Sequence, residues 1–493
     1  MNEILVDFAQ INFPSIIPAL IIIVGAITIL VVDLIKTPSK SFNTYIAIFA
    51  VCASLCSLLT LKTGEIGFFE LLQVDGLSIY AQILILIASV MFLLLSLTTH
   101  RSNEFEHSEF YALFLFVIVG FQFMVSTSNL IMVFLGLETS SLALYTMIAM
   151  RGRDRAIEGA IKYFTMGALG SGFFAFGAAC FYGATGSVDF INAFNNLDAS
   201  NYNNIIMLVL SMAFFVAAFG FKLALVPFHA WTPDVYEGAS APLAGYMAIV
   251  PKLAAFIVAM RLFEYLGSAK VDWITVTLWI AAVLTMTLGN AMALSQESVK
   301  RMLAYSAISH SGFAIVAILL ATPDANAAFL IYWTFYLFSG MGAFAMLWVF
   351  RHRSKPFQGR FDHPYEKFSG MVHIMPIGAT MMCLFILSLA GVPPFGVFWG
   401  KLFLVMAALE KGYIWLAIIM VLNSSVAVYY YLKLIGYMYL HEPSETIKVT
   451  YVHNITTTFK IAIFVAATVT ALAAFLVNPI LSVITGYLQS AGF

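Results

Sequence analysis

Charged residues are scarce in this sequence. Asp, Glu, Lys and Arg together make up 10% of its 493 residues, whereas an ordinary soluble domain carries about 25%. Hydrophobic residues make up 61%, and the mean hydropathy is +0.93. This composition excludes a soluble globular domain and predicts a polytopic protein of the lipid bilayer. The net charge of -1 gives no sign of a nucleic-acid partner.

Cysteine and the motifs of common cofactor sites are also scarce. The 4 cysteines, Cys52, Cys56, Cys180 and Cys383, lie in apolar segments and form no CxxC pair. We therefore expect no disulfide framework, zinc site or iron–sulfur cluster. No glycine-rich phosphate loop precedes a lysine and a serine or threonine. Residues 1–13 contain no Lys or Arg, unlike a signal peptide, which predicts that the first helix is retained.

Long apolar segments fill most of the chain. A membrane-spanning helix needs about 20 mainly apolar residues. Fourteen segments meet this requirement: 14–33, 43–61, 77–99, 110–126, 129–149, 157–183, 204–226 with a continuation to 240, 242–263, 272–293, 299–320, 325–350, 372–409, 412–438 and 457–487. The expected fold class is all-α. Pro227 interrupts the seventh segment, and Pro393 and Pro394 interrupt the twelfth, so both helices should be discontinuous.

The basic residues between these segments predict how the chain is oriented. If the N-terminus lies outside, fourteen Lys and Arg residues fall in inside loops and four in outside loops. Short inside loops carry the excess of basic residues in membrane proteins. The sequence therefore predicts that both termini lie on the outer face.

Four ionisable residues lie deep inside predicted spans, where charge is costly. They are Glu138, Lys222, Lys252 and Lys401. A charge at the bilayer centre costs about 3 kcal/mol, and one carboxylate cannot pair with three lysines. Because burial disfavours the charged form of lysine, a buried lysine can release its proton near neutral pH. This set favours a proton relay over static ion pairs.

Three further residues are possible members of the relay. His310 lies among hydroxyl residues on the tenth segment, and histidine suits proton transfer because it titrates near neutral pH. His229 follows Pro227 in the broken seventh segment, where relay and purely structural roles are equally open. Lys162 lies one turn after Glu158, so an ion pair or an extended side chain at the membrane surface competes with a relay role.

Short similarities recur in the same order along the chain. Residues 219–226 and 398–405 align on Lys222 and Lys401 with five of eight positions identical. Glu138 and His310 occupy corresponding places ahead of them. Five helices per unit would invert the second unit, an architecture of transporters with discontinuous helices at the membrane midplane. We expect three N-terminal helices in 1–109, a first repeat in 110–263, an inverted repeat in 264–438 and a last helix in 439–493.

The stretch from Phe221 to Gly238, with Pro251 and Lys252, resembles the proton-translocating, antiporter-like subunits of NADH–quinone oxidoreductase, respiratory complex I. Residues 155–164 and 169–172 resemble the subunit N branch of the bacterial enzyme. The resemblance implies that Glu138 and Lys222 form the pair of helices five and seven. It also implies that Lys252 is the central lysine and Lys401 the lysine of helix twelve. His310 stands where related subunits use lysine.

The resemblance also implies where the chain works. It would lie in the bacterial cytoplasmic (inner) membrane beside other membrane subunits, related antiporter-like subunits among them. FMN, iron–sulfur clusters and the quinone site would belong to partner subunits, and quinone reduction there would drive proton translocation here. A subunit of a multi-subunit cation/proton antiporter remains the alternative function. A purely structural membrane scaffold is a third hypothesis.

Overall fold

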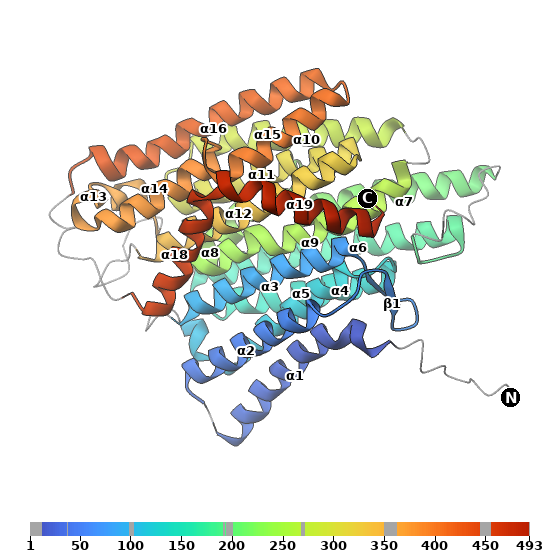
Figure 1. Cartoon of the computed structure of the whole chain (residues 1–493), viewed down its shortest axis with the longest axis horizontal. Helices are drawn as coiled ribbons and strands as arrows, with labels where there is room; N and C mark the ends of the chain where they lie inside the picture. The colour runs from blue at the N-terminus through green and yellow to red at the C-terminus, as the bar shows by residue number, and fades with distance from the viewer. Residues whose placement is uncertain are drawn as a thin grey trace.

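The chain folds into a bundle of long helices in the computed structural model, which describes residues 12–36, 38–97, 103–190, 193, 201–267, 272–349, 362–443 and 455–492 (Figure 1). Residues 1–11, on which the prediction for the N-terminus rests in part, lie outside this range. The helices are α1 (Phe13–Ile35), α2 (Lys40–Leu58), α3 (Gly76–Ser96), α4 (Ser108–Val125), α5 (Leu130–Ala149), α6 (Asp154–Thr185), α7 (Tyr202–Leu223), α8 (Thr232–Gly238), α9 (Ala241–Gly267), α10 (Asp272–Leu294), α11 (Val299–Leu320), α12 (Pro323–Val349), α13 (Met371–Ile374), α14 (Pro376–Ala390), α15 (Gly396–Glu410), α16 (Ile414–Leu440), α18 (Thr457–Ala471) and α19 (Ala473–Ala491).

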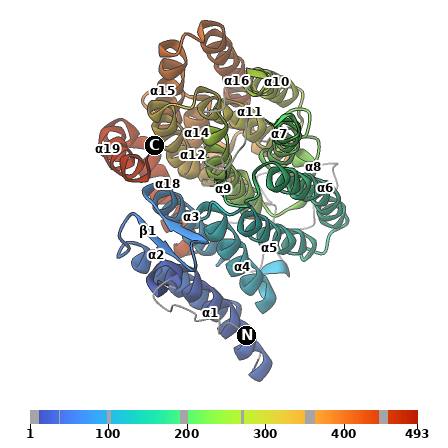
Figure 2. The ribbon, with the colours of Figure 1, turned by 90° about the vertical axis from the view of Figure 1, so that its right-hand side faces the viewer.

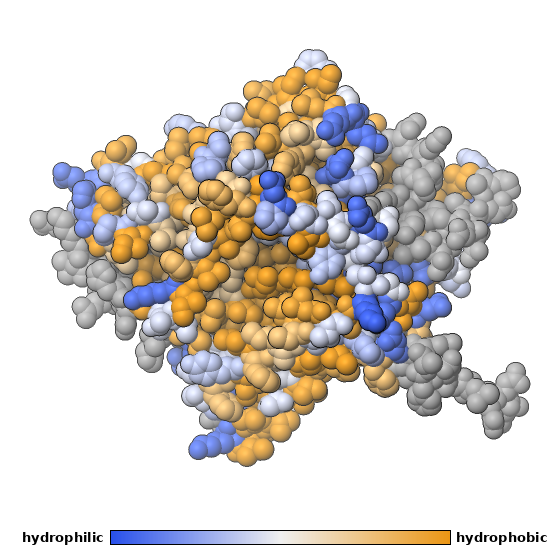
Figure 3. All heavy atoms as spheres, viewed as in Figure 1, coloured by the Kyte–Doolittle hydropathy of each residue, from blue (hydrophilic) through white to orange (hydrophobic). Residues whose placement is uncertain are grey.

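The predicted membrane spans are confirmed. In the described residues, 13 helices are long and apolar enough to cross a membrane. The shorter helices α14 and α15 together form one more crossing, and α18 belongs to the same predicted segment as α19. Figure 3 shows the outward result: hydrophobic residues dominate the middle of the molecule, and polar residues gather toward its two ends. Such an apolar belt with polar ends matches the layers of a bilayer.

Three helices form the centre of the bundle. The apolar windows of α9, α11 and α12 are fully enclosed by the other helices (Figure 2). A helix that is hydrophobic on all sides is expected to be buried, because it has no polar face to turn outward. The deep polar residues of α9 and α11 therefore lie far from lipid, inside protein. This position allows them to keep polar side chains that lipid would not tolerate.

The two predicted helix breaks lie where proline removes backbone donors. Helix α7 ends at Leu223, where Ala224 takes a left-handed conformation with a φ of 57°. Pro227 lies in the following turn, and Pro233 starts α8 at a position where no N–H is needed. Helix α14 ends at Ala390, the following Gly391 has a φ of 84°, and α15 begins after the two prolines.

The predicted all-α fold class is confirmed, and two local details add to it. The last segment is not one straight helix, because α18 ends at Ala471 and α19 continues in a new direction (Figure 1). Thr470 donates its hydroxyl to the Ala466 carbonyl four residues earlier, a bond that bends helices. A small hairpin of β1 (Glu65–Gly67) and β2 (Leu72–Val74) accompanies the helices, and its strands are too short to show a strand pattern in the sequence.

Helix α1 meets this hairpin, and the last helix meets the start of α3, which follows the hairpin in the chain. The Asn12 side chain, ahead of α1, donates to the Ile66 carbonyl at 3.1 Å. The last turn of α19 packs against Gly76 at the start of α3. Both described ends of the chain therefore lie on one side, as fourteen crossings require. That this side is the outer face stays a prediction.

The division into two inverted five-helix units also stays a prediction. The packing partners are compatible with it: α4 packs on α5 as α10 packs on α11, and α6 packs on α7 as α12 packs on α15.

Helix α15 approaches α12 through two glycines. A Cβ on Gly396 would lie 2.7 Å from Phe335 Cβ, and one on Gly400 would collide with the backbone of Tyr332. Small residues four apart allow such close packing.

We expect Gly400→Ala to lower the stability of the protein by about 1–3 kcal/mol, because the backbones of α12 and α15 must separate. Thermal unfolding of the purified protein in detergent measures this loss of stability. Gly436→Ala is the matched control, because a Cβ there meets nothing within 4 Å. Equal stability of the two variants would contradict the packing argument.

Candidate functional site

Lys222 lies in the last turn of α7, immediately before the helix break. Its ammonium donates to Ser141 Oγ on α5 at 2.6 Å, and Ser141 donates to the Leu137 carbonyl at 2.5 Å. The partial negative charge at a helix C-terminus favours a cation at this position. The break therefore places a lysine at the end of a helix dipole, with a neutral hydroxyl as its hydrogen-bond partner.

Glu138 lies near Lys222 without pairing directly with it. The carboxylate acts electrostatically on Lys222, yet among the described residues no carboxylate lies within 4.0 Å of the ammonium. A cavity of about 20 Å³ adjoins Lys222 and is lined also by Tyr163, Ser171 and Trp231. The hydroxyl of Ser171 has no partner. This space suffices for about one water molecule, which could join polar groups that do not touch.

Lys252 lies in the middle of the enclosed helix α9 and is 1% exposed. Its ammonium donates to the Ala307 carbonyl at 2.7 Å and to Ser311 Oγ at 2.9 Å, both on α11. Pro251 precedes it and deprives the Met247 carbonyl of its usual helical donor. The hydroxyl of Tyr236 on α8 donates to that carbonyl at 3.1 Å. Tyr236 thus supplies the donor that Pro251 takes away, one residue before Lys252.

His310 on α11 is 3% exposed and lies between two tyrosines. Its Nδ1 hydrogen-bonds with the hydroxyl of Tyr332 on α12, and its Nε2 lies 3.2 Å from the hydroxyl of Tyr431 on α16. The Tyr431 hydroxyl also bonds to Ser306 Oγ. Each of these groups can both donate and accept, so a proton can be exchanged along the chain of hydroxyls without a change of partners.

Lys401 on α15 is 7% exposed and faces the end of α14. Its ammonium lies 3.4 Å from the Leu389 carbonyl and 3.3 Å from the Ala390 carbonyl. It also lies 5.1 Å from the centre of the Phe313 ring, on α11. The last carbonyls of a helix lack intrahelical donors and attract cations. Like Lys222, Lys401 therefore interacts with a helix C-terminus at a proline break.

The predicted relay residues fall into two groups. Glu138 and Lys222 lie together on α5 and α7. Lys252, His310 and Lys401 lie around α11, where both lysines act electrostatically on the histidine. Among the described residues, no hydrogen bond or ion pair joins the two groups directly. Transfer between them therefore requires water or movement of side chains.

Lys162 is partly exposed and belongs to a surface network rather than to either group. It pairs with Glu158 Oε1 and with Asp234 Oδ2, both at 2.7 Å. Asp234 also pairs with Arg301 at 2.7 Å, which links α6, α8 and α11. The ion pair that the sequence allowed is thus present, with a second carboxylate that the sequence did not indicate. His229 is half-buried in the helix break, and its Nδ1 has no hydrogen-bond partner.

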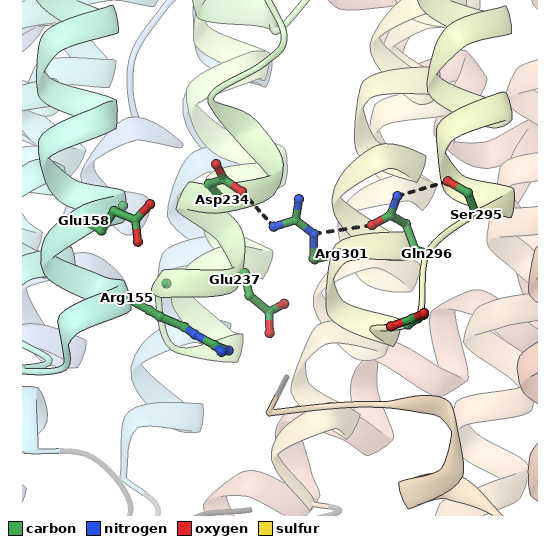
Figure 4. A pocket seen from close by; sticks show the side chains of 10 residues that line it. Arg155, Glu158, Asp234, Glu237, Ser295, Gln296 and Arg301 are labelled. Atoms are coloured by element: carbon green, nitrogen blue, oxygen red, sulfur yellow. Dashed lines mark hydrogen bonds and ion pairs between the residues drawn. The ribbon is translucent and has the colours of Figure 1, made fainter. Parts of the chain in front are cut away.

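A polar cavity of about 420 Å³ lies between α6, α8 and α11 (Figure 4). Its lining residues are Arg155, Glu158, Gly159, Asp234, Glu237, Gly238, Ser295, Gln296, Glu297 and Arg301. It opens at the end of the bundle that holds Arg155 and Arg301, which the basic residues predict to be the inner face. In the sequence, Asp234 and Glu237 fall in the continuation of the seventh predicted segment to residue 240. Pro233, at the start of a new helix, is the one signal that could have distinguished these two residues from ordinary carboxylates at a span end.

No group of three His, Cys, Asp or Glu side chains in the described part of the chain is close enough to hold a metal ion. The polar groups of the site are instead hydroxyls, carbonyls, lysines, one histidine and carboxylates. These groups bind and release protons or hydrogen-bond to water. The arrangement is therefore suited to proton transfer.

Comparison with known proteins identifies related chains. A family model described as NADH:quinone oxidoreductase/Mrp antiporter, TM, matches residues 127–427. NADH-quinone oxidoreductase subunit N of Sulfurovum sp. is 47% identical, over 100% of both chains. A chain of respiratory complex I from Thermus thermophilus superposes with a TM-score of 0.77 at 30% identity, covering 94% of this chain and 98% of that one. A chain of the Mrp complex from Dietzia sp. has a TM-score of 0.82 at 18% identity, covering 97% of each, which shows a shared fold alone.

Proposed function

The chain belongs to the family of NADH–quinone oxidoreductase subunit N, and on this premise we propose that Glu138, Lys222, Lys252, His310 and Lys401 carry protons across the membrane. Lys222 would be loaded near the break of α7, and Lys401 would release protons near the break of α15. Lys252 and His310 would connect them around α11. Lys162 and His229 would hold the surrounding structure, since Lys162 is bound by two carboxylates.

The observation that carries this proposal is the kind of partner that each deep lysine has. Lys222, Lys252 and Lys401 donate to hydroxyl or carbonyl oxygens, and no described carboxylate lies within 4.0 Å of any of them. A lysine locked in a buried ion pair loses several kcal/mol when its proton leaves. A lysine among neutral oxygens loses less, because burial already disfavours its charge. Proton transfer is therefore accessible at these three positions.

The energy for transport would come from elsewhere. Moving one proton against 100 mV costs about 2.3 kcal/mol. We propose that quinone reduction in partner subunits supplies this energy, and that FMN and iron–sulfur clusters reside there. The neighbours would be other membrane subunits, including related antiporter-like subunits. The complex would lie in the bacterial inner membrane, with both termini of this chain outside.

The cation/proton antiporter alternative shares the fold. The likeness to the Mrp complex is at 18% identity, so it carries no argument about activity. The full-length relative at 47% identity is a subunit of NADH-quinone oxidoreductase, which favours the main proposal.

Purification of the native complex through a tag on this chain separates these functions. We expect flavin and iron–sulfur proteins to co-purify, and NADH with quinone to acidify the lumen of vesicles that contain the complex. A complex without flavin that exchanges cations for protons in the absence of NADH would instead identify the antiporter.

A further inference from the structure

The polar cavity at the predicted inner face contains one carboxylate whose surroundings differ from those of its neighbours. Glu237 is 6% exposed, and its Oε1 has no hydrogen-bond partner. Its Oε2 accepts a hydrogen bond from Ser298 at 3.1 Å. Figure 4 shows the carboxylate pointing from α8 into the cavity, between Arg155 of α6 and Arg301 of α11. An unpartnered buried oxygen carries a cost, which a proton or a water molecule would relieve.

The other acidic residues of the cavity are already engaged or lie in solvent. Asp234 has both carboxylate oxygens paired, with Lys162 and Arg301. Glu158 pairs with Lys162. Glu297 lines the cavity but is exposed. Among the described lining residues, Glu237 is thus the buried carboxylate without an ion pair.

Two titratable groups close to the cavity are unsuited to taking up protons. Burial acts to raise the pKa of Asp362, but Arg151, Lys300 and Arg153 outweigh it and hold that pKa below its usual range. Burial, with Lys367, Lys300 and the two arginines, lowers the pKa of His363 well below its usual range. Asp362 therefore stays charged and His363 stays neutral near pH 7.

Two cations bind the backbone carbonyls at the end of α8, beginning with that of Glu237. Lys300 donates to the Glu237 carbonyl at 3.1 Å and also binds the Ala239 carbonyl, and Arg151 donates to the Gly238 carbonyl at 2.6 Å. These bonds satisfy the last carbonyls of α8, which have no helical donors. They hold the short helix in place without occupying Oε1 of the Glu237 carboxylate.

The polar cavity and the small cavity beside Lys222 follow one another along α6 and α8. Its wall includes Gly159 of α6 and Asp234 of α8, and the small cavity beside Lys222 begins one turn further on, at Tyr163 of α6 and Trp231 before α8. With a rise of about 1.5 Å per residue, Trp231 and Glu237 are separated by about 9 Å along the axis of α8. The larger cavity has room for on the order of ten water molecules.

We propose that Glu237 takes up protons from the inner aqueous phase and passes them through the two cavities to Lys222. The inference rests on the proposed proton-translocating function and adds the residue at which uptake occurs. In the step, Glu237 Oε1 binds a proton from cavity water and becomes a neutral carboxylic acid. The proton then leaves through water to the neutral amine of Lys222, which becomes an ammonium. No electron is transferred, and Glu237 returns to its charged form.

Paired isosteric substitutions in the assembled complex test this proposal. Glu237→Gln keeps the acceptor for Ser298 but cannot carry a proton, so NADH-driven proton pumping per assembled complex should fall about tenfold or more. Glu237→Asp and Glu237→Asn have the same shortened shape and differ in whether they titrate. The Asp variant should pump and the Asn variant should not. Glu297→Gln, in the exposed part of the same cavity, should pump like the parent protein.

The outcomes separate this inference from the function on which it rests. If Glu237→Gln pumps like the parent protein while Lys222→Ala does not, uptake at Glu237 is wrong and the proton-translocating function stands. If the Asp and Asn variants pump equally, Glu237 has at most a structural role and the inference is overturned, even where the Gln variant fails to assemble. If Lys222→Ala also pumps normally, the proposed function itself fails.

Discussion

A complex that carries Lys252→Met should assemble normally and lose proton transfer through this chain by on the order of 100-fold. Methionine has nearly the length of lysine but no group that binds a proton. The loss leaves no polar group stranded, because the Ala307 carbonyl still accepts the Ser311 hydroxyl at 3.0 Å. Replacing a buried charge by an apolar side chain of similar volume is often neutral or stabilising. Proton pumping in vesicles, normalised to the amount of assembled complex, measures the effect.

This variant separates a relay from a scaffold because the two hypotheses predict opposite changes. If this chain is only a scaffold, the Lys252→Met complex keeps or gains stability and continues to pump protons. If this chain is a relay, the Lys252→Met complex keeps its stability but protons no longer pass through the chain. Lys252→Arg is the control, because it retains the donors to α11 but holds its proton too tightly to release it. Normal pumping by both the Met and Arg variants would exclude Lys252 from the proton path.

Lys401→Gln should also abolish most of the proton transfer through this chain, while the helix break stays intact. The lysine has a structural role that Lys252 lacks, since it faces the unpaired carbonyls of Leu389 and Ala390. The amide of glutamine can donate to the same carbonyls, but it cannot titrate. We expect a stability change of at most about 1 kcal/mol, the net value of one hydrogen bond. The fall in pumping should again approach 100-fold.

Lys401→Met serves as the comparison for that variant. It removes both the proton-binding group and the hydrogen bonds, so it should be less stable than Lys401→Gln and equally inactive. Thermal unfolding and pumping measured on the same preparations distinguish the two contributions. Pumping by the Gln variant at the parent rate would show that Lys401 only secures the end of α14.

Sequence reasoning located the spans and the deep charges because both stand out against an apolar background. A run of about 20 apolar residues has one stable environment, and a lysine inside such a run is conspicuous. The two breaks were predictable for a similar reason, since proline cannot donate within a helix. The left-handed residues Ala224 and Gly391 then end α7 and α14 close to those prolines.

The partners of these residues could not be predicted, because they come from helices far apart in the chain. Ser311 lies 59 residues from Lys252, and Tyr431 lies 121 residues from His310. Nothing in the local sequence selects Ser141 instead of Glu138 as the oxygen that Lys222 contacts. Packing between helices decides that choice, and the hydrophobic pattern of one helix does not specify its neighbours.

Charged residues at span ends were the least predictable. Lys300 and Arg261 lie at the edges of the predicted segments 299–320 and 242–263 and were counted with the loops in the orientation, but they are 0% and 2% exposed. Lys300 binds the end of α8, and Arg261 pairs with Asp75 at 2.7 Å. Burial is possible in both places because backbone carbonyls or a carboxylate compensate the charge. Glu237 belongs to the same class, since its surroundings depend on where α8 lies between α6 and α11.

The most direct test of the account is the number of protons translocated per NADH oxidised by a complex that carries Lys222→Ala. The account predicts a lower ratio than that of the parent complex, at equal assembly, because protons can no longer pass through this chain. An unchanged ratio in a fully assembled Lys222→Ala complex would contradict the central claim that the buried lysines carry the protons.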